Sequence, residues 1–161
     1  MSDEEYTRIV NLFIDDVQRM AYACCRNLND AEDITQTVFM KLHLYKKEFD
    51  SDEHVKRWLI RVAVNESRSL LRSPWKKRVT LDIQERAALS APQKGDAGNE
   101  VLTAINLLGR KYREIVFLHY FEEYSTKEMA EILGISQSTV LKRLQRAREK
   151  LKELLSDGKE N

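Results

Sequence analysis

The chain has few of the residues on which β-rich, disulfide-linked or membrane-spanning proteins depend. Two prolines and five glycines among 161 residues speak against a sandwich, a barrel or a collagen-like fold. No stretch approaches the roughly 20 apolar residues that cross a membrane. The acidic start, from Met1 to Glu5, lacks the basic and then apolar order of a secretory signal peptide. We therefore expect a cytoplasmic protein that does not insert into a membrane.

Cysteine and histidine are also scarce, and their placement argues against a disulfide framework or a metal site. The cysteines are the neighbours Cys24 and Cys25, and adjacent cysteines bridge poorly, so we interpret them as small buried apolar side chains. The histidines, His43, His54 and His119, stand apart, and no Cys or His cluster has metal-ligand spacing. A glycine-rich phosphate loop is missing too. The sequence therefore predicts no metal, no cofactor and no enzyme.

Charge and a helical composition are what the chain does contain. Charged residues make up 33% of the sequence, and the 42% of apolar residues are enough for a core. Lys, Arg, Glu and Leu dominate while glycine and proline are few, which favours a mostly helical chain, and we expect an all-α fold. Between Lys56 and Arg78 lie eight basic residues and one acidic residue, and between Lys142 and Lys152 six basic residues and one acidic residue. On a chain of net charge +1, two basic stripes suggest two contacts with a polyanion. Solvated helix faces would show the same charge runs.

The apolar periodicity falls into two helical parts. In the first part, apolar residues at three- and four-residue steps predict helices over Ser2 to about Asn27, Asn29 or Asp30 to about Tyr45, and about Glu53 to Arg72. Ser2 with Glu5 fits a capping box, and Lys47–Glu53 reads as a loop. In the second part the same steps predict helices over about Asn99–Leu108, Arg110–Glu122, about Thr126–Leu133 and Ser136 to about Leu155.

Between these parts, residues 73–98 show no sustained period and hold both prolines. The segment is too long for an ordinary connection inside a compact domain, and Ser73-Pro74 stops the preceding helix. We therefore expect two small helical domains, 1–73 and 99–161, joined by a flexible linker, 74–98.

The segment from Thr126 to Val140 predicts a helix-turn-helix. Ala130 is small where the second helix crosses, Gly134 can take a positive φ at the turn, and Ser136 can cap the second helix. A plain amphipathic hairpin is the alternative interpretation.

The last predicted helix has an outer face that could enter the major groove of DNA. Lys142 could donate to guanine and Gln145 could pair with adenine. Arg143, Arg146 and Arg148 are better placed for phosphates, which set register rather than sequence.

The third predicted helix carries polar side chains at steps of four, four, three and four, which place them on one face: Arg57, Arg61, Asn65, Arg68 and Arg72. The four arginines could contact successive phosphates of a nucleic-acid strand. The side-chain amide of Asn65, which lies among them, could form hydrogen bonds with a base. Phe49 lies in the preceding loop, and aromatic rings beside a basic face can stack on unpaired bases. Trp58 suits core packing better than direct stacking.

Several motifs in order resemble one family, the extracytoplasmic-function (group 4) sigma factors of bacterial RNA polymerase. Residues 31–39 (AEDITQTVF) resemble the family's polymerase-binding helix, and 58–65 (WLIRVAVN) its promoter-melting helix. Residues 112–121 (YREIVFLHYF), with the helix-turn-helix, resemble its second domain. The resemblance implies a non-catalytic subunit that binds core RNA polymerase and directs promoter-specific transcription initiation.

The resemblance also implies roles for particular residues. Capture of the unpaired −10 strand would involve Phe49, Arg57, Arg61, Asn65, Arg68 and Arg72. Contact with the −35 duplex would involve Gln137, Ser138, Thr139, Leu141, Lys142, Arg143, Gln145 and Arg146. Docking on the clamp helices of the polymerase would involve Asp33, Gln36, Thr37, Met40 and Lys41. Because family members are often held by an anti-sigma factor, such a partner is expected here as well.

A stand-alone helix-turn-helix regulator is the alternative function, since the output domains of response regulators look similar. Such a protein would bind duplex DNA without polymerase and would need a sensing or phosphoacceptor domain. The first 72 residues show no alternation of strands and helices and are too short for a receiver fold.

Overall fold

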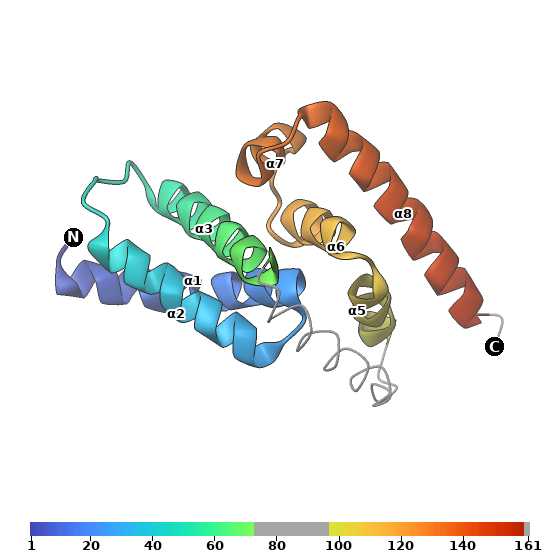
Figure 1. Cartoon of the computed structure of the whole chain (residues 1–161), viewed down its shortest axis with the longest axis horizontal. Coiled ribbons are helices and arrows are strands. Elements are labelled where there is room, and N and C mark those ends of the chain that lie inside the picture. The colour runs from blue at the N-terminus through green and yellow to red at the C-terminus, as the bar shows by residue number, and fades with distance from the viewer. Residues whose placement is uncertain (73–96, 160–161) are drawn as a thin grey trace. The chain divides into compact units, whose positions relative to one another are not determined.

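The computed structural model of the chain describes residues 1–72 and 97–159 (Figure 1). Within these ranges the regular elements are all helical, in agreement with the predicted fold class. The chain divides into two compact units, Met1–Leu81 and Asp82–Asn161. The predicted linker, 74–98, and the predicted stop at Ser73-Pro74 lie outside the described residues, except that residues 97 and 98 already belong to a helix.

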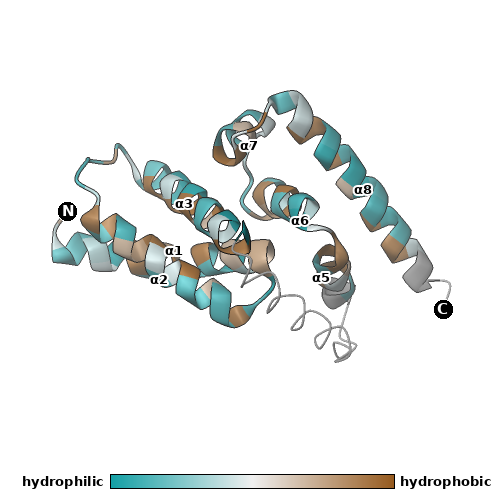
Figure 2. Ribbon diagram, viewed as in Figure 1, coloured by the Kyte–Doolittle hydropathy of each residue, from teal (hydrophilic) through white to brown (hydrophobic). Residues whose placement is uncertain are grey.

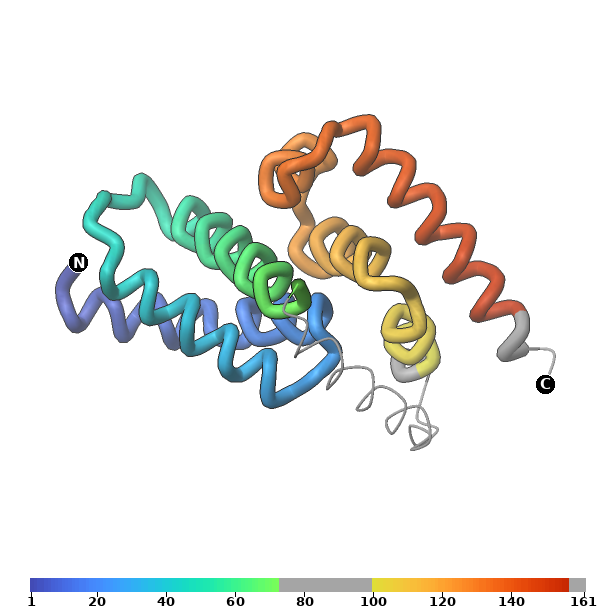
Figure 3. Tube along the Cα trace, in the orientation of Figure 1, coloured from blue at the N-terminus to red at the C-terminus, as the bar shows by residue number. Residues whose placement is uncertain are grey.

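The first unit consists of three described helices, α1 (Asp3–Cys25), α2 (Leu28–Leu44) and α3 (Asp52–Arg72). Each of them contacts the other two, as the tube in Figure 3 shows. Their apolar positions recur as brown bands between hydrophilic ones in Figure 2. These positions meet in one core, which includes Val17, Val38, Leu42, Leu59 and Ala63, all fully buried.

The joint between α1 and α2 differs from the prediction. Arg26 takes a left-handed conformation with φ 53° and its N–H bonds to Tyr22 O at 2.8 Å, so α1 ends at Cys25. Asn27 is extended and its Oδ1 accepts the N–H of Asp30 at 2.9 Å. The predicted caps, Asn29 and Asp30, are therefore wrong, because the earlier asparagine takes that role and Asp30 is buried inside α2.

The second unit contains α5 (Ala97–Leu107), α6 (Arg110–Val116), a π-helix η1 (Phe117–Phe121), α7 (Thr126–Leu133) and α8 (Gln137–Lys159). The single helix predicted over Arg110–Glu122 is not observed. At Phe117 the helix widens, and Glu122 N bonds to Phe117 O at 3.0 Å across five residues. Within this turn the rings of Phe117 and Phe121 stack, with 4.7 Å between their centres. Apolar periodicity gives no signal for this change.

The helix-turn-helix is confirmed with the expected local contacts. Gly134 takes φ +67°, a conformation that costs other residues about 1–2 kcal/mol. Ser136 Oγ accepts the N–H of Thr139 at 3.2 Å and so caps α8. Val140 is fully buried, as expected for the residue that packs α8 back on α7.

Candidate functional site

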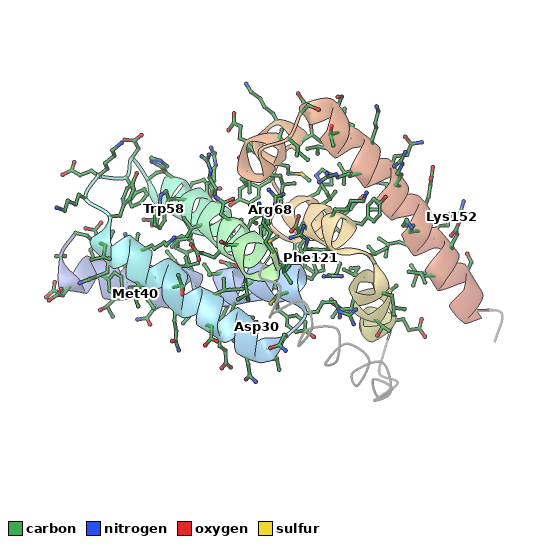
Figure 4. All side chains as sticks on the ribbon, in the orientation of Figure 1. Asp30, Met40, Trp58, Arg68, Phe121 and Lys152 are labelled. Atoms are coloured by element: carbon green, nitrogen blue, oxygen red, sulfur yellow. The ribbon has the colours of Figure 1, made fainter. Side chains whose placement is uncertain are left out.

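The basic residues of α3 lie on the solvent side of an unbroken helix. Val55, Leu59 and Ala63 are buried in the core, and Ile60 and Val64 beside them are buried as well. The opposite side of the helix is left for polar side chains. The predicted −10 contacts are exposed at Arg57, Arg61, Asn65 and Arg72 and half-buried at Arg68. Figure 4 labels Arg68 and Trp58 on this helix. The structure therefore provides a basic helix face at the predicted place.

The loop between α2 and α3, predicted as Lys47–Glu53, spans residues 45–51, because Asp52 and Glu53 already belong to α3. It rests on a cluster of aromatic rings. The ring of Phe49 stacks on Tyr45 at 5.0 Å and meets the ring of Trp58 edge-on at 5.8 Å. Phe49 and Trp58 are both half-buried and pack against the core. The expectation that Trp58 packs rather than stacks on a base agrees with this geometry. Because of these contacts, the ring of Phe49 is less accessible to an unpaired base than the sequence suggests.

An ion pair joins α1 to the start of α3. Both terminal guanidinium nitrogens of Arg8 donate to the carboxylate of Asp52, at 3.0 and 2.9 Å. These hydrogen bonds hold the pKa of Asp52 below its ordinary value and raise that of Arg8. The two residues are 44 positions apart in the chain, so nothing in the sequence pattern signals the pair.

The outer face of α8 is open to solvent as predicted. The exposed members of the predicted −35 set are Gln137, Ser138, Leu141, Lys142, Gln145 and Arg146, whereas Thr139 and Arg143 are half-buried. Leu141 is 52% exposed in the middle of this polar face. An apolar side chain here is suited to the methyl group of thymine.

Some of the α8 residues already have partners within the unit. The hydroxyl of Thr139 lies 2.8 Å from Ser136 Oγ at the helix cap. The amide of Gln137 donates to Thr126 Oγ1 at 2.9 Å, which ties α8 to α7. Thr139 and Gln137 therefore also have structural roles, which sequence reasoning missed.

Arg146 is bound to a residue of α6 that sequence reasoning did not assign to the DNA face. Burial of the Tyr112 ring raises the pKa of its hydroxyl, but the hydrogen bond from Arg146 and the charges of Lys111 and Lys150 outweigh this and lower the pKa. The ammonium groups of Lys111 and Lys150 lie 5.2 and 5.3 Å from the ring centre, within cation–π range. Tyr112 therefore lies among three cationic side chains, two of which, Arg146 and Lys150, belong to α8.

The predicted polymerase-binding residues line one side of α2. Asp33, Gln36, Met40 and Lys41 are exposed and Thr37 is half-buried. Met40, labelled in Figure 4, is 61% exposed. Lys41 forms an ion pair with Glu66 of α3. This pair joins the predicted polymerase surface to the helix that carries the −10 residues.

Gln36 and Met40 also border an apolar groove of about 480 Å³ between α1 and α2. The groove is lined from α1 by Tyr6, Val10 and Ile14. Sequence reasoning found only the α2 side of it, because the contribution of α1 depends on how the two helices pack.

The described residues also bear on the remaining predictions. Cys24 and Cys25 are both buried, as expected. Among residues 1–72 and 97–159, no group of three or more histidine, cysteine, aspartate or glutamate side chains could hold a metal ion. In the same ranges, no helix has the length and apolar character needed to span a membrane.

Comparison with known proteins supplies the family. The model described as "Sigma-70 region 2" matches residues 9–77, and "Sigma-70, region 4" matches residues 98–151. The chain is 31% identical to the ECF RNA polymerase sigma factor SigM of Bacillus subtilis, covering 93% of this chain and 94% of that protein. It is 28% identical to SigW of the same organism, covering 96% and 90%.

Solved structures agree in fold. The sigma factor RpoE from Bartonella quintana, in complex with the anti-sigma factor NepR, matches with a TM-score of 0.72 at 23% identity, covering 95% of this chain and 98% of that one. CnrH, in complex with the cytosolic domain of CnrY, matches with a TM-score of 0.66 at 25% identity, covering 97% and 90%. The paired region matches and the similarity to SigM show that this chain belongs to the extracytoplasmic-function sigma factors of the sigma-70 family.

Proposed function

We propose that this sigma factor binds core RNA polymerase through α2 and brings it to promoters through two DNA contacts, one on each unit. One observation carries the proposal: each unit exposes a basic helix face, α3 in the first and α8 in the second, and each unit matches a different sigma-70 region. A stand-alone regulator would not need the first of these regions. The proposed domains are 1–73 and 99–161, with 74–98 as the linker.

The α3 face captures the unpaired strand of the −10 element. The phosphates of this strand are contacted by Arg57, Arg61, Arg68 and Arg72. Asn65, which lies among these arginines, forms hydrogen bonds with a base. Phosphate contacts set register while base contacts set sequence preference. Because the face binds the single strand and not the closed duplex, its affinity shifts the promoter towards the open state.

The α8 face holds the −35 element as duplex. Its exposed residues suit the major groove, with Lys142 and Gln145 as base readers and Leu141 against a thymine methyl. Arg143 and Arg146 contact phosphates, and the bond to Tyr112 aims Arg146.

The α2 face docks on the polymerase. Asp33, Gln36 and Thr37 supply polar contacts, and the exposed thioether of Met40 gives an apolar contact at the edge of the groove between α1 and α2. The protein contributes no catalysis of its own and acts in the cytoplasm, where the polymerase works. An anti-sigma factor is a further proposed partner, supported by the complex of RpoE with NepR.

Gel filtration with core RNA polymerase from the source organism tests this function. We expect co-elution near one to one, and transcription from a promoter that the core enzyme ignores. A Met40→Asp variant should lose co-elution, whereas a Leu28→Asp variant, which alters an equally exposed apolar residue at the other end of α2, should keep it. Absence of co-elution, together with tight duplex binding by the protein alone, would support the stand-alone regulator instead.

A further inference from the structure

The loop between α2 and α3 is bound to the first turn of α3 through one histidine. The backbone N–H of Asp50 donates to Nδ1 of His54 at 3.2 Å, and the backbone N–H of His54 donates to Ser51 Oγ at 3.1 Å. The carboxylate of Asp50 lies 3.8 Å from the same Nδ1, beyond hydrogen-bond distance. A backbone N–H can only donate, so Nδ1 carries a lone pair and the neutral ring holds its proton on Nε2.

The same imidazole also contacts the side chain at the centre of the loop. Its ring meets Phe49 edge-on, with 5.2 Å between centres and 80° between planes. Phe49 is in turn enclosed by Tyr45 and Trp58. One residue of α3 therefore fixes both the backbone at Asp50 and the ring at Phe49.

We propose that His54 is a positioning residue, which holds the loop 45–51 in the shape that receives the unpaired −10 strand. This inference rests on the proposed capture of the unpaired −10 strand by the first unit and extends that role to the loop that carries Phe49. In this arrangement Phe49 anchors the loop in the aromatic cluster, and the side chain of Asp50, 97% exposed, points to solvent. A loop that is already in its binding shape loses less conformational entropy when the strand binds.

The state of the ring gives a first test, which needs no ligand. In the full-length protein at neutral pH, long-range 1H–15N spectra of the imidazoles should show His54 with its proton on Nε2 and none on Nδ1. The amide of Asp50 should also exchange more slowly than that of Glu48. A proton on Nδ1 of the neutral ring would overturn the proposal, because that tautomer cannot accept the Asp50 N–H.

Three variants then distinguish the contribution of the hydrogen bond to Asp50 from that of the ring contact with Phe49. His54→Asn keeps an acceptor near the position of Nδ1, His54→Phe keeps an aromatic ring without an acceptor, and His54→Ala removes both. The assay is promoter opening by holoenzyme, on a promoter found by transcribing genomic DNA with this holoenzyme. Loss of one hydrogen bond corresponds to about a three- to tenfold loss of open complexes. We expect this loss for His54→Phe and His54→Ala, and opening within about twofold of wild type for His54→Asn.

Controls distinguish failure of this inference from failure of the proposed function. Asn65→Ala, measured in the same assay, reports on the α3 face itself. If Asn65→Ala reduces opening and His54→Phe does not, the positioning role is wrong and the proposed function stands. If Asn65→Ala opens the promoter as well as wild type, the proposed function of α3 is wrong. Should the variants fail to fold, a proton on Nδ1 of the wild-type ring would still overturn the proposal, and slow exchange of the Asp50 amide would support it.

Discussion

The two basic faces are held in place by different kinds of contact. The α8 face follows a turn built from neighbouring residues: Gly134 and Ser136 shape its start. A capping box of Ser125 with Glu128 begins the helix before it, with bonds of 3.1 and 3.4 Å. Every one of these signals lies within one short segment of the sequence.

The α3 face depends on contacts between residues far apart in the chain. Arg8 of α1 reaches Asp52 at the start of α3. Tyr45 at the end of α2 packs 4.8 Å from Trp58 on α3. The start of α8 is therefore specified locally, whereas the start of α3 depends on contacts with α1 and with the end of α2.

The largest expected effect comes from the core beneath the α3 face. Leu59→Ala removes a fully buried side chain and should lower the free energy of unfolding of the first unit by about 2–5 kcal/mol. Hydrogen exchange should show faster opening in α1 to α3 and little change in α6 to α8. Leu44→Ala, at a site 68% exposed, is the control and should change little. Equal destabilisation of both units would contradict their independence.

Charge reversal on the α3 face should have the next largest effect. Arg61→Glu places a carboxylate against the phosphates of the unpaired strand, so promoter opening should fall about a hundredfold. Binding to core polymerase should be unchanged in gel filtration. Arg19→Glu, the same change at an exposed site on α1, should open promoters normally. A loss of polymerase binding by Arg61→Glu would contradict the proposal that this face contacts DNA.

The corresponding change on the α8 face should be smaller. Lys142→Glu should weaken holoenzyme binding to a promoter with a −35 element about tenfold, measured by titration at fixed salt. The matched control, Lys152→Glu, alters another exposed lysine ten residues further along α8 and should bind as wild type. Equal weakening by both variants would indicate a general charge effect instead of a groove contact.

A backbone change at the turn before α8 tests whether the conformation of Gly134 determines the stability of the helix-turn-helix. Gly134→Ala meets no atom within 4 Å, so its cost should come from the positive φ alone, about 1–2 kcal/mol of unfolding free energy in the second unit. Amide hydrogen exchange in α7 and α8, measured at increasing concentrations of denaturant, gives this change in unfolding free energy. No change in stability would show that the turn does not require the left-handed conformation.

The smallest expected effect is the pH dependence of the pair of Arg8 and Asp52. Because the folded pKa of Asp52 is lowered, the pair stabilises the fold above the ordinary aspartate pKa of about 4. That stability is lost as the pH falls through the lower, folded value. Asp52→Asn should therefore be less stable than wild type at pH 7 and nearly equal to it near pH 2. A difference that persists in acid would mean that the pair is not its cause.

The features that depend on local sequence patterns could be predicted from the sequence alone. The helical class, the turn at Gly134, the cap at Ser136 and the exposed faces of α3 and α8 all follow from residue type and spacing. The buried state of Cys24 and Cys25 was predicted from their apolar character, and the structure confirms it. Whether the named residues touch DNA or polymerase stays a prediction.

What the sequence did not predict depends on packing or on competition between neighbours. Asn27, Asn29 and Asp30 are all good caps by type, and only the path of the chain selects Asn27. The bond of Arg146 to Tyr112 and the acceptor role of His54 need three-dimensional proximity. The π-helix at Phe117 changes the hydrogen-bond pattern without changing the apolar period.

If α3 and α8 contact different parts of one promoter, their variants should differ in how they change the permanganate reactivity of unpaired −10 thymines. Holoenzymes carrying Asn65→Ala or Lys142→Glu would be compared on a full promoter and on one without a −35 element. Asn65→Ala should reduce reactivity on both promoters, whereas Lys142→Glu should reduce it only where the −35 element is present. Equal losses on both promoters for Lys142→Glu, or none for Asn65→Ala, would contradict this division of contacts.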